Sequence, residues 1–327
     1  MARYIFKRLL FFIPVLFVIS LLNFALYSNA PGDPITAMYS HLLVDGSDSV
    51  LTDEALANMR ARLGLDQPWP VRYGIWLGQV LQGDLGRSLI SQRPVTEIIN
   101  RALWPTIQLN VSAVVLGVTV GILLGVLQGL RQYSFIDYLL SMLSYLYISL
   151  PSFFLAVVLI YIFALQLGWL PPAGYETVGI ESNWRDRARH LALPMMTLAL
   201  GTAPGLMRYT RTAILEVIRQ PFTVTAKAKG LSRRAIIWGH VFRNSMIPVV
   251  THLGAILPGL IGGSVIIEQI FAWPGMGRLA IRAAFERDYP LLMGLVLLSS
   301  LILVVSILLV DIVYAMVDPR IRYDENK

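Results

Sequence analysis

The chain contains no cysteine among its 327 residues. This absence excludes disulfide bonds, a thiol nucleophile and zinc held by cysteine. Histidine is rare as well, and His41, His190, His240 and His252 are scattered without the spacing of a metal-binding motif. We expect each histidine to be a surface or interfacial residue, and we expect no metal site.

Lysine is scarce too, which bears on nucleotide binding. The only four lysines stand at positions 7, 227, 229 and 327, and none of them follows a glycine. A phosphate-binding loop ends in Gly-Lys-Ser/Thr, because the lysine and the backbone amides together hold the phosphates. We therefore expect no cofactor in this chain. If ATP drives the protein, another chain must bind it.

Charged residues make up only 14% of the chain, whereas apolar residues make up 56%. A soluble domain carries about 25% charged residues, so the deficit indicates a membrane protein. A helix needs about 20 mostly apolar residues to cross the hydrocarbon layer. The predicted fold is an all-α polytopic membrane protein with six transmembrane helices, in the apolar segments at roughly 9–29, 106–129, 137–165, 191–207, 246–271 and 290–316.

The first apolar segment has one alternative interpretation, a cleaved signal peptide, because Ser28-Asn29-Ala30 resembles a small-x-small cleavage site. The apolar region of a signal peptide is about 7–15 residues long, which is shorter than this run. We expect a retained helix.

Basic residues predict the orientation. The formal charge of +7 would raise nucleic acid as a partner of a soluble protein, but here topology explains it and we expect no nucleic acid. With the N-terminus inside, 15 lysines and arginines lie inside and 12 outside, 6 of these in the long 30–105 segment. The segment 208–243 holds eight basic residues and one acidic residue. Both termini are predicted to be cytoplasmic.

The segment between the first two predicted spans is too polar to cross a membrane. We expect it to form an ordered external subdomain on the membrane surface, with one short helix capped by Thr52 and a second that opens at Pro70 and ends at Gly83. The predicted parts are the N-terminal end and first span (1–30), the extracytoplasmic subdomain (31–105) and a core of five spans with a cytoplasmic loop at 208–245 (106–327).

Glycine and buried charge stand out within the predicted spans. Gly117, Gly121, Gly125 and Gly129 recur every four residues, which predicts one helix face that another backbone approaches closely. Ionisable residues within spans are functional candidates by default. Glu268 is expected to line a pore or gate, or to reach the interface.

A second acid, Asp311, lies near the inner end of the last predicted span. Arg320 or Arg322 is expected to pair with it.

The 208–245 loop also carries local helix signals. Pro221 or Thr225 can start a short helix, and Gly230 can turn the chain with a positive φ. Alanines leave a flat surface for another protein, and basic residues suit an acidic partner or lipid headgroups. Composition alone favours a plain cytoplasmic loop.

At this loop the sequence resembles a known family. Thr225-Ala226-Lys227-Ala228-Lys229-Gly230-Leu231-Ser232 resembles the cytoplasmic coupling loop of ABC importer permeases, in the form typical of the dipeptide/oligopeptide/nickel branch. Val224 and Thr225 stand where the generic pattern of the family has Glu and the first Ala. Ala226 and Gly230 match that pattern. Further resembling fragments are 83–88, 243–248, 268–279, 287–290 and 317–320.

The resemblance implies a non-enzymatic permease subunit in the bacterial inner membrane, forming half of a path for small peptides. It implies a homologous second permease, two ATPase subunits that bind ATP and Mg, an extracytoplasmic solute-binding protein, and lipid. The implied ATPase-coupling residues are Phe222, Thr225, Ala226, Lys227, Ala228, Lys229, Gly230, Leu231, Arg233 and Arg234. The gate or pathway candidates are Glu268, Trp273, Pro274 and Gly275.

Alternatives from other classes remain at this stage. A passive channel would use Glu268 in a filter. An intramembrane enzyme would need Ser264 and His252 to meet, yet they are twelve residues, or about 18 Å, apart on one helix. Dipeptides, oligopeptides, glutathione, opines and nickel are all transported within the branch, and we prefer small peptides.

Overall fold

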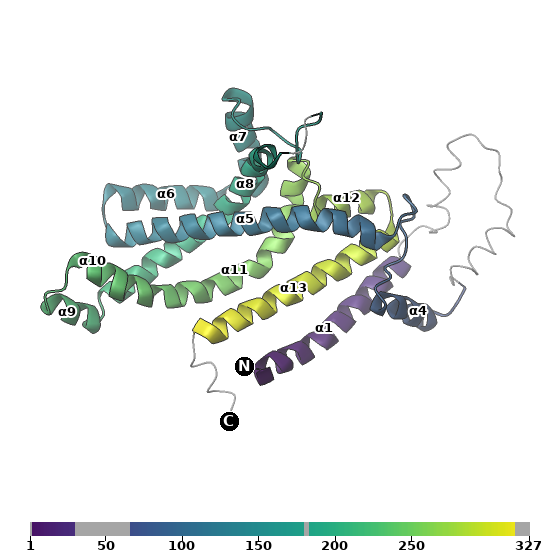
Figure 1. Cartoon of the computed structure of the whole chain (residues 1–327), viewed down its shortest axis with the longest axis horizontal. Helices are drawn as coiled ribbons and strands as arrows, with labels where there is room; N and C mark the ends of the chain where they lie inside the picture. The colour runs from purple at the N-terminus through teal and green to yellow at the C-terminus, as the bar shows by residue number, and fades with distance from the viewer. Residues whose placement is uncertain (1, 30–65, 180–182, 318–327) are drawn as a thin grey trace. The chain divides into compact units, whose positions relative to one another are not determined.

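The computed structural model describes residues 2–29, 66–179 and 183–317. Within these ranges every regular element is helical, apart from one isolated bridge between Arg87 and Pro94 (Figure 1). The all-helical prediction is confirmed for the described chain. The predicted helix after Thr52, the fragment residues beyond Val317 and the arginines expected to pair with Asp311 lie outside the described residues.

Several helices are long and apolar enough to cross a membrane. Among the described residues there are three by length and composition, or four if one bent helix pair counts as a span. They are Leu10–Ser28 of α1 (Ala2–Ser28), α5 (Val95–Leu130), Tyr289–Ile312 of α13 (Tyr289–Val317), and the pair formed by α6 (Phe135–Ser149) with α7 (Ser152–Leu159) and the π-helix η1 (Ile160–Gln166).

The remaining two predicted spans fall on two further long helices. One is less apolar, and the other has side chains that lie outside the described residues. α8 (Trp184–Ile218) has 35 residues, of which the stretch between Arg189 and Arg208 carries no Asp, Glu, Lys or Arg. α11 (Arg243–Ile270) has 28 residues, and the side chains of 254–263 lie outside the description.

The third predicted span is not one straight helix, which is a feature that the sequence analysis did not predict. α6 ends just before Leu150, which takes an extended conformation with φ −94° and ψ 133°. The helices before and after this break are bent by 110° relative to each other. Pro151 is the cause, because its ring disfavours a helical conformation in the residue before it and it has no amide hydrogen to donate.

By internal contacts the chain forms two compact units. The larger unit comprises Met1, Pro105–Gly277 and Val305–Lys327, and the smaller comprises Ala2–Trp104 and Arg278–Val304.

The larger unit is built on close packing of α5 against α8. A Cβ atom added to Gly125 would lie 2.5 Å from the carbonyl oxygen of Met207, and one added to Gly129 would lie 2.6 Å from Cγ2 of Ile214. Real Cβ atoms do not come this near, so the two backbones meet at a distance that only glycine permits. The predicted glycine face is confirmed.

In the smaller unit, α4 (Trp69–Leu81) packs along the C-terminal half of α1. Pro70 lies in its first turn, as the sequence predicted. The Phe24 ring meets Trp69 and Tyr73 edge-to-face at 5.5 Å each. The buried Tyr73 places its hydroxyl 2.8 Å from Oγ of Ser20, so an apolar stack with one polar contact holds α4 on α1.

A buried carboxylate joins two of the family-like fragments of the smaller unit. Oδ2 of Asp288 accepts a 2.5 Å hydrogen bond from Oγ of Ser88, and Oδ1 accepts from the amide of Leu89 at 3.1 Å. Asp288 also precedes α13, where it faces the amide of Leu291. The fragments 83–88 and 287–290 are thus two sides of one structural contact.

We predict that Asp288→Asn destabilises the protein by about 1–3 kcal/mol, because a buried donor loses its charged acceptor. Thermal unfolding in detergent measures this. Glu97→Gln is the matched control, since the exposed pair that Glu97 forms with Arg101 contributes little. Equal melting temperatures for the two variants would contradict the assignment.

Candidate functional site

The coupling segment, defined here as Pro221–Phe242, is a compact series of short helices. α9 (Pro221–Ala228) opens on Pro221, and α10 (Arg233–Ala235) follows a turn in which Gly230 has φ +79°. Oγ of Ser232 caps α10 by accepting from the amide of Ala235 at 3.3 Å, and the π-helix η2 (Ile236–Phe242) continues into α11. The predicted proline start and glycine turn are both confirmed.

One side of the coupling segment is seated on the helices of the larger unit. Ala226, Ile236 and Val241 are buried in one cluster with Ile214 of α8 and Val126 of α5. This apolar contact ties the segment to the C-terminal ends of both helices.

A hydrogen bond supports the same seat. The buried Thr223 donates from Oγ1 to the carbonyl oxygen of Val217 at 3.1 Å. α9 is therefore joined to the end of α8 by a polar contact as well as by the apolar cluster.

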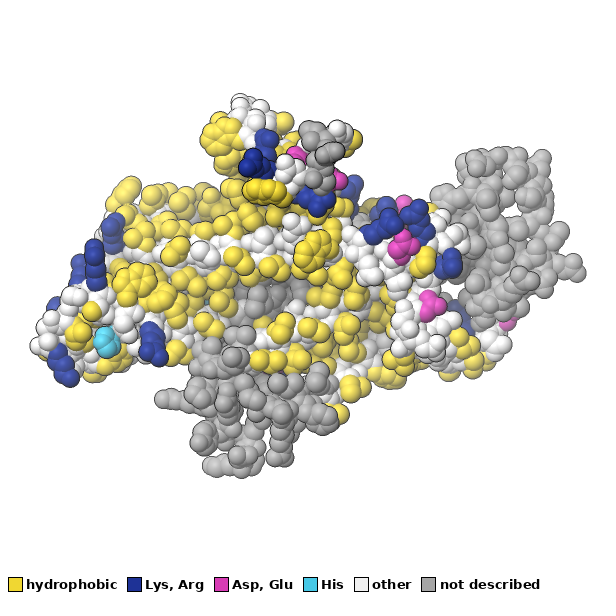
Figure 2. Space-filling model, in the orientation of Figure 1, with side chains coloured by type: hydrophobic (Ala, Val, Ile, Leu, Met, Phe, Trp, Pro, Cys, Tyr) yellow, Lys and Arg dark blue, Asp and Glu magenta, His cyan; other side chains and the backbone are white. Residues whose placement is uncertain are grey.

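The other side of the coupling segment is exposed. Of the ten predicted coupling residues, Ala226 alone is buried, and the remaining nine face outward. Figure 2 shows Lys and Arg side chains gathered at the end of the molecule where Figure 1 places α9 and α10. Phe222 and Leu231 are 42% and 41% exposed among these charges. Apolar side chains with a basic rim form a surface suited to another protein.

Glu268, the first gate candidate, is fully buried near the end of α11. Oε1 accepts from Oγ1 of Thr106 at 2.8 Å and from Oγ of Ser264 at 3.2 Å, while Oε2 accepts from the amide of Gly277 at 2.7 Å. The expectation that Glu268 reaches the interface was wrong, because these donors hold it inside the larger unit.

The turn after α11 is shaped around this carboxylate. A Cβ atom added to Gly275 would lie 2.5 Å from Oε1 of Glu268, and one added to Gly277 would lie 2.9 Å from Oε2. The buried Trp273 donates from Nε1 to the carbonyl oxygen of Pro105 at 2.9 Å. The structure therefore brings Glu268, Trp273 and Gly275 together, whereas Pro274 is exposed.

The loop between η1 and α8 lies against the same turn. The Tyr175 ring meets Trp273 edge-to-face at 4.8 Å, and its hydroxyl donates to Oε1 of Gln108 at 3.2 Å. The amide of Gly174 donates to the carbonyl oxygen of Phe271 at 2.8 Å. Through these contacts the loop, α5 and the Trp273 turn form one assembly.

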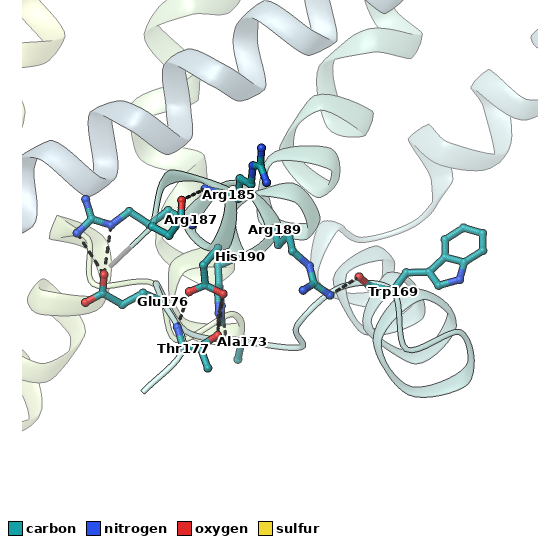
Figure 3. A network of polar contacts seen from close by, with 10 residues as sticks. Trp169, Ala173, Glu176, Thr177, Arg185, Arg187, Arg189 and His190 are labelled. Atoms are coloured by element: carbon teal, nitrogen blue, oxygen red, sulfur yellow. Dashed lines mark hydrogen bonds and ion pairs between the residues drawn. The ribbon is translucent and has the colours of Figure 1, made fainter. Parts of the chain in front are cut away.

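His190 closes the loop onto the start of α8 (Figure 3). It is buried, with Nδ1 3.1 Å from the carbonyl oxygen of Ala173 and Nε2 3.3 Å from Oγ1 of Thr177. The expected surface position was wrong for this histidine, because the loop folds over it. Sequence spacing gave no signal for that contact.

Asp186 and two arginines complete this outer network. The backbone amide and the hydroxyl of Thr177 each donate to Asp186 at 2.7 Å, and they hold the pKa of its carboxyl below the ordinary value. This contact is therefore retained near neutral pH and weakens as the pH falls through the lowered pKa. Figure 3 shows Arg187 directed at Glu176 and Arg189 at the backbone of Trp169, at 3.1 Å and 3.0 Å.

An ion pair that the sequence analysis missed lies elsewhere in the larger unit. Nε of Arg211 on α8 is 2.7 Å from Oδ1 of Asp137 at the start of α6, and Nη2 is 2.8 Å from Oδ2. Asp137 is buried. Asp137 begins the third predicted span, and an acidic residue at that position is a signal that it has a charged partner. Arg211 belongs to the basic segment 208–243, which predicted the orientation of the chain and not this contact.

Among residues 2–29, 66–179 and 183–317, no group of three or more histidine, aspartate or glutamate side chains is arranged to hold a metal ion.

Comparison with known proteins finds family models that match both the N-terminal and the C-terminal part of the chain. Residues 117–323 match the family model described as binding-protein-dependent transport system inner membrane component, and residues 1–110 match the model of its N-terminal part. The chain is 40% identical to the oligopeptide transport system permease protein AppB of Bacillus subtilis, covering 99% of this chain and 100% of that protein. It is 38% identical to the glutathione transport system permease protein GsiC of Salmonella paratyphi A, with the same coverages.

Solved structures support the fold. A methionine ABC transporter matches with a TM-score of 0.54 at 19% identity, covering 68% of this chain and 96% of that chain. An amino acid ABC transporter with histidines matches with a TM-score of 0.52 at 16% identity, covering 68% and 94%. The chain belongs to the family of binding-protein-dependent transport system inner membrane components, the membrane-embedded and non-catalytic permease subunits of ABC importers.

Proposed function

We propose that this permease forms half of a translocation path for small peptides. The observation that carries the substrate class is whole-length similarity to an oligopeptide permease and, at 38% identity, to a putative peptide permease of Brucella suis. Glutathione, named for another relative, is itself a short peptide. The passive channel and the intramembrane enzyme are not retained, because the family is one of ATP-driven importers with separate motors.

A binding-protein-dependent ABC system implies ATPase subunits, a binding protein and a partner permease. In our proposal the partner is a homologous second permease, two ATPase chains bind ATP and Mg, and an external binding protein delivers the peptide. Lipid surrounds the assembly, and nucleic acid has no part in it.

The proposed topology has six spans with both termini cytoplasmic. α8 and α11 supply the two spans that composition alone does not identify, and the 31–105 segment lies on the external side of the membrane without crossing it. Support comes from the coupling segment, whose concentration of basic residues fits the cytoplasmic side.

The exposed face of the coupling segment is the proposed ATPase contact. Phe222 and Leu231 would enter an apolar groove, and the surrounding lysines and arginines would meet acidic side chains. Because the opposite face is seated on Ile214 and Val126, movement of the ATPases is passed to α8 and α5.

The network around Glu268 is the proposed scaffold of the outer gate. Glu268 acts there as a positioning residue, since it accepts from the amide of Gly277 at the turn and from the hydroxyls of Thr106 and Ser264 on the neighbouring helices. Pro274 is the exposed tip of this turn and the part that would meet peptide or partner.

The outer helix α4 is proposed to lie within the outer leaflet. Tyr73 reaches Ser20, which lies eight residues, or about 12 Å, before the end of the candidate span Leu10–Ser28. The opposite side of α4 exposes Val71 and Ile75, at 47% and 54%. At that depth an apolar side chain meets acyl chains.

We predict that deleting residues 225–231 abolishes peptide uptake and coupled ATP hydrolysis while membrane insertion remains intact. Gly230→Val impairs both, because a β-branched residue at positive φ costs about 1–2 kcal/mol and shifts the turn. Uptake into proteoliposomes is the measurement. Gly239→Ala is the control, as its site is open. Normal uptake by the deletion variant would refute the proposed contact.

We predict that Glu268→Gln loosens the outer turn, because the new amide group cannot accept from all three donors. A cysteine introduced at the exposed Pro274 reports the change, since the native chain has no cysteine. Its reaction with a water-soluble maleimide is expected to accelerate. Glu286→Gln is the exposed control and leaves the rate unchanged. An unchanged rate in Glu268→Gln would exclude the positioning role.

We predict that nitroxide labels on Val71→Cys and Ile75→Cys in liposomes collide more with oxygen than with a water-soluble nickel chelate. The reason is that oxygen concentrates among acyl chains. Arg101→Cys is the control and shows the opposite preference, since Arg101 is exposed and charged. High nickel collision at Val71 and Ile75 would place α4 in water, and low collision with both reagents would mean that protein covers it.

A further inference from the structure

We propose that the Asp137–Arg211 pair is the joint that makes α6 move together with α8 when the coupling segment is displaced. This proposal rests on the proposed ATPase contact, and it assigns a positioning role to two residues outside that contact.

The geometry of the Asp137–Arg211 pair is specific, and both oxygens of the carboxylate accept more than one hydrogen bond. The two nitrogens of Arg211 meet the two carboxylate oxygens of Asp137 side by side, at 2.7 Å and 2.8 Å. Oδ2 of Asp137 also accepts from the amide of Tyr133 at 3.0 Å, in a turn where Tyr133 has φ +62°. Two parallel charge-assisted bonds fix an angle as well as a distance, which an apolar contact does not.

A third helix is bound into the same joint. Nε2 of Gln128 on α5 lies 3.3 Å from Oδ1 of Asp137, 3.1 Å from its carbonyl oxygen and 3.1 Å from Oγ of Ser141. Gln128 is fully buried. Polar side chains from the end of α5, the start of α6 and the C-terminal part of α8 therefore form one cluster.

The joint lies where force from the coupling segment would enter. Arg211 precedes the end of α8 at Ile218 by seven residues, about 10 Å along the helix. α9 begins three residues after Ile218, and its seat includes Ile214, one helical turn beyond Arg211. Any shift of α9 that moves α8 therefore pulls on Asp137.

From α6 the displacement has a physical route to the outer turn. α6 continues past Pro151 into α7, where Ala156 and Leu159 are buried with Leu193 of α8 and with Ile267 and Phe271 at the end of α11. Phe271 directly precedes the turn held by Glu268. The joint thus connects the coupling segment with the proposed gate inside the larger unit.

Stability alone is an insufficient reason for this pair. Ionisable residues near a membrane interior are costly, and apolar residues of similar volume often replace a buried ion pair without loss of stability. What such a replacement removes is the fixed register between two helices. The double variant Asp137→Leu with Arg211→Met therefore separates a mechanical role from a structural one.

The experiment uses the complete transporter in proteoliposomes with a short peptide as the probe. The number of ATP molecules hydrolysed per peptide taken up is measured, together with the melting temperature and the ATPase content of the complex. The variants are the apolar double variant, Arg211→Lys and Gly230→Val. Glu216→Gln is the control, because it removes an exposed charge from α8 five residues after Arg211.

We expect the apolar double variant to assemble and melt like the native complex, to hydrolyse ATP, and to consume several-fold more ATP per peptide. Arg211→Lys, which keeps the charge but not the paired geometry, is expected to fall between it and the native ratio. Glu216→Gln keeps the native ratio. Proper assembly with a native ratio in the double variant would overturn the proposal.

The two proposals fail in distinguishable ways. If Gly230→Val also keeps the native ratio, or if native permease does not retain ATPase subunits, the proposed contact itself is wrong. If Gly230→Val is uncoupled and the double variant is not, the contact stands and the joint is rejected. Should the double variant fail to assemble, Arg211→Lys decides the matter by the same ratio.

Discussion

The close approach of α5 and α8 is the constraint on which the larger unit depends. Four glycines spaced by four residues remove the side chains that would hold the two backbones apart. With α5 and α8 in contact, their C-terminal ends together form the seat of the coupling segment, through Val126 and Ile214. In the proposed mechanism this helix pair moves as one element, because its two backbones are in direct contact.

The two candidate sites of the larger unit are built in opposite ways. The coupling segment buries few of its residues and leaves nearly all of its predicted contact residues free, as a docking surface requires. The outer turn instead surrounds one buried carboxylate with hydroxyl and amide donors and with glycines that admit it. The first arrangement leaves a surface exposed, and the second fixes the conformation of a turn.

Much of this organisation follows from the sequence because it depends on local chemistry. The proline start of α9, the positive φ of Gly230 and the glycine face of α5 each reflect a restriction on a single residue type. The bend before Pro151 was also open to prediction, since proline acts on its predecessor in any context.

The rest required contacts between residues far apart in the chain. Asp288 lies 200 residues from Ser88, and Glu268 lies 162 residues from Thr106. No spacing rule pairs such residues. His190 was expected at a surface because nothing in its neighbourhood shows that residues 173–177 fold over it. Buried polar networks in membrane helices are therefore where sequence reasoning ends and tertiary structure decides.

The central claim is that the exposed face of the coupling segment contacts an ATPase subunit. A photo-crosslinking amino acid placed at Val224 or Leu231, with Arg185 on the outer network as the control position, tests this most directly in the assembled transporter. The account predicts covalent adducts between the permease and an ATPase chain from Val224 and Leu231, changing in yield when ATP is added, and none from Arg185. Absence of ATPase adducts from both inner positions in an active transporter would contradict it.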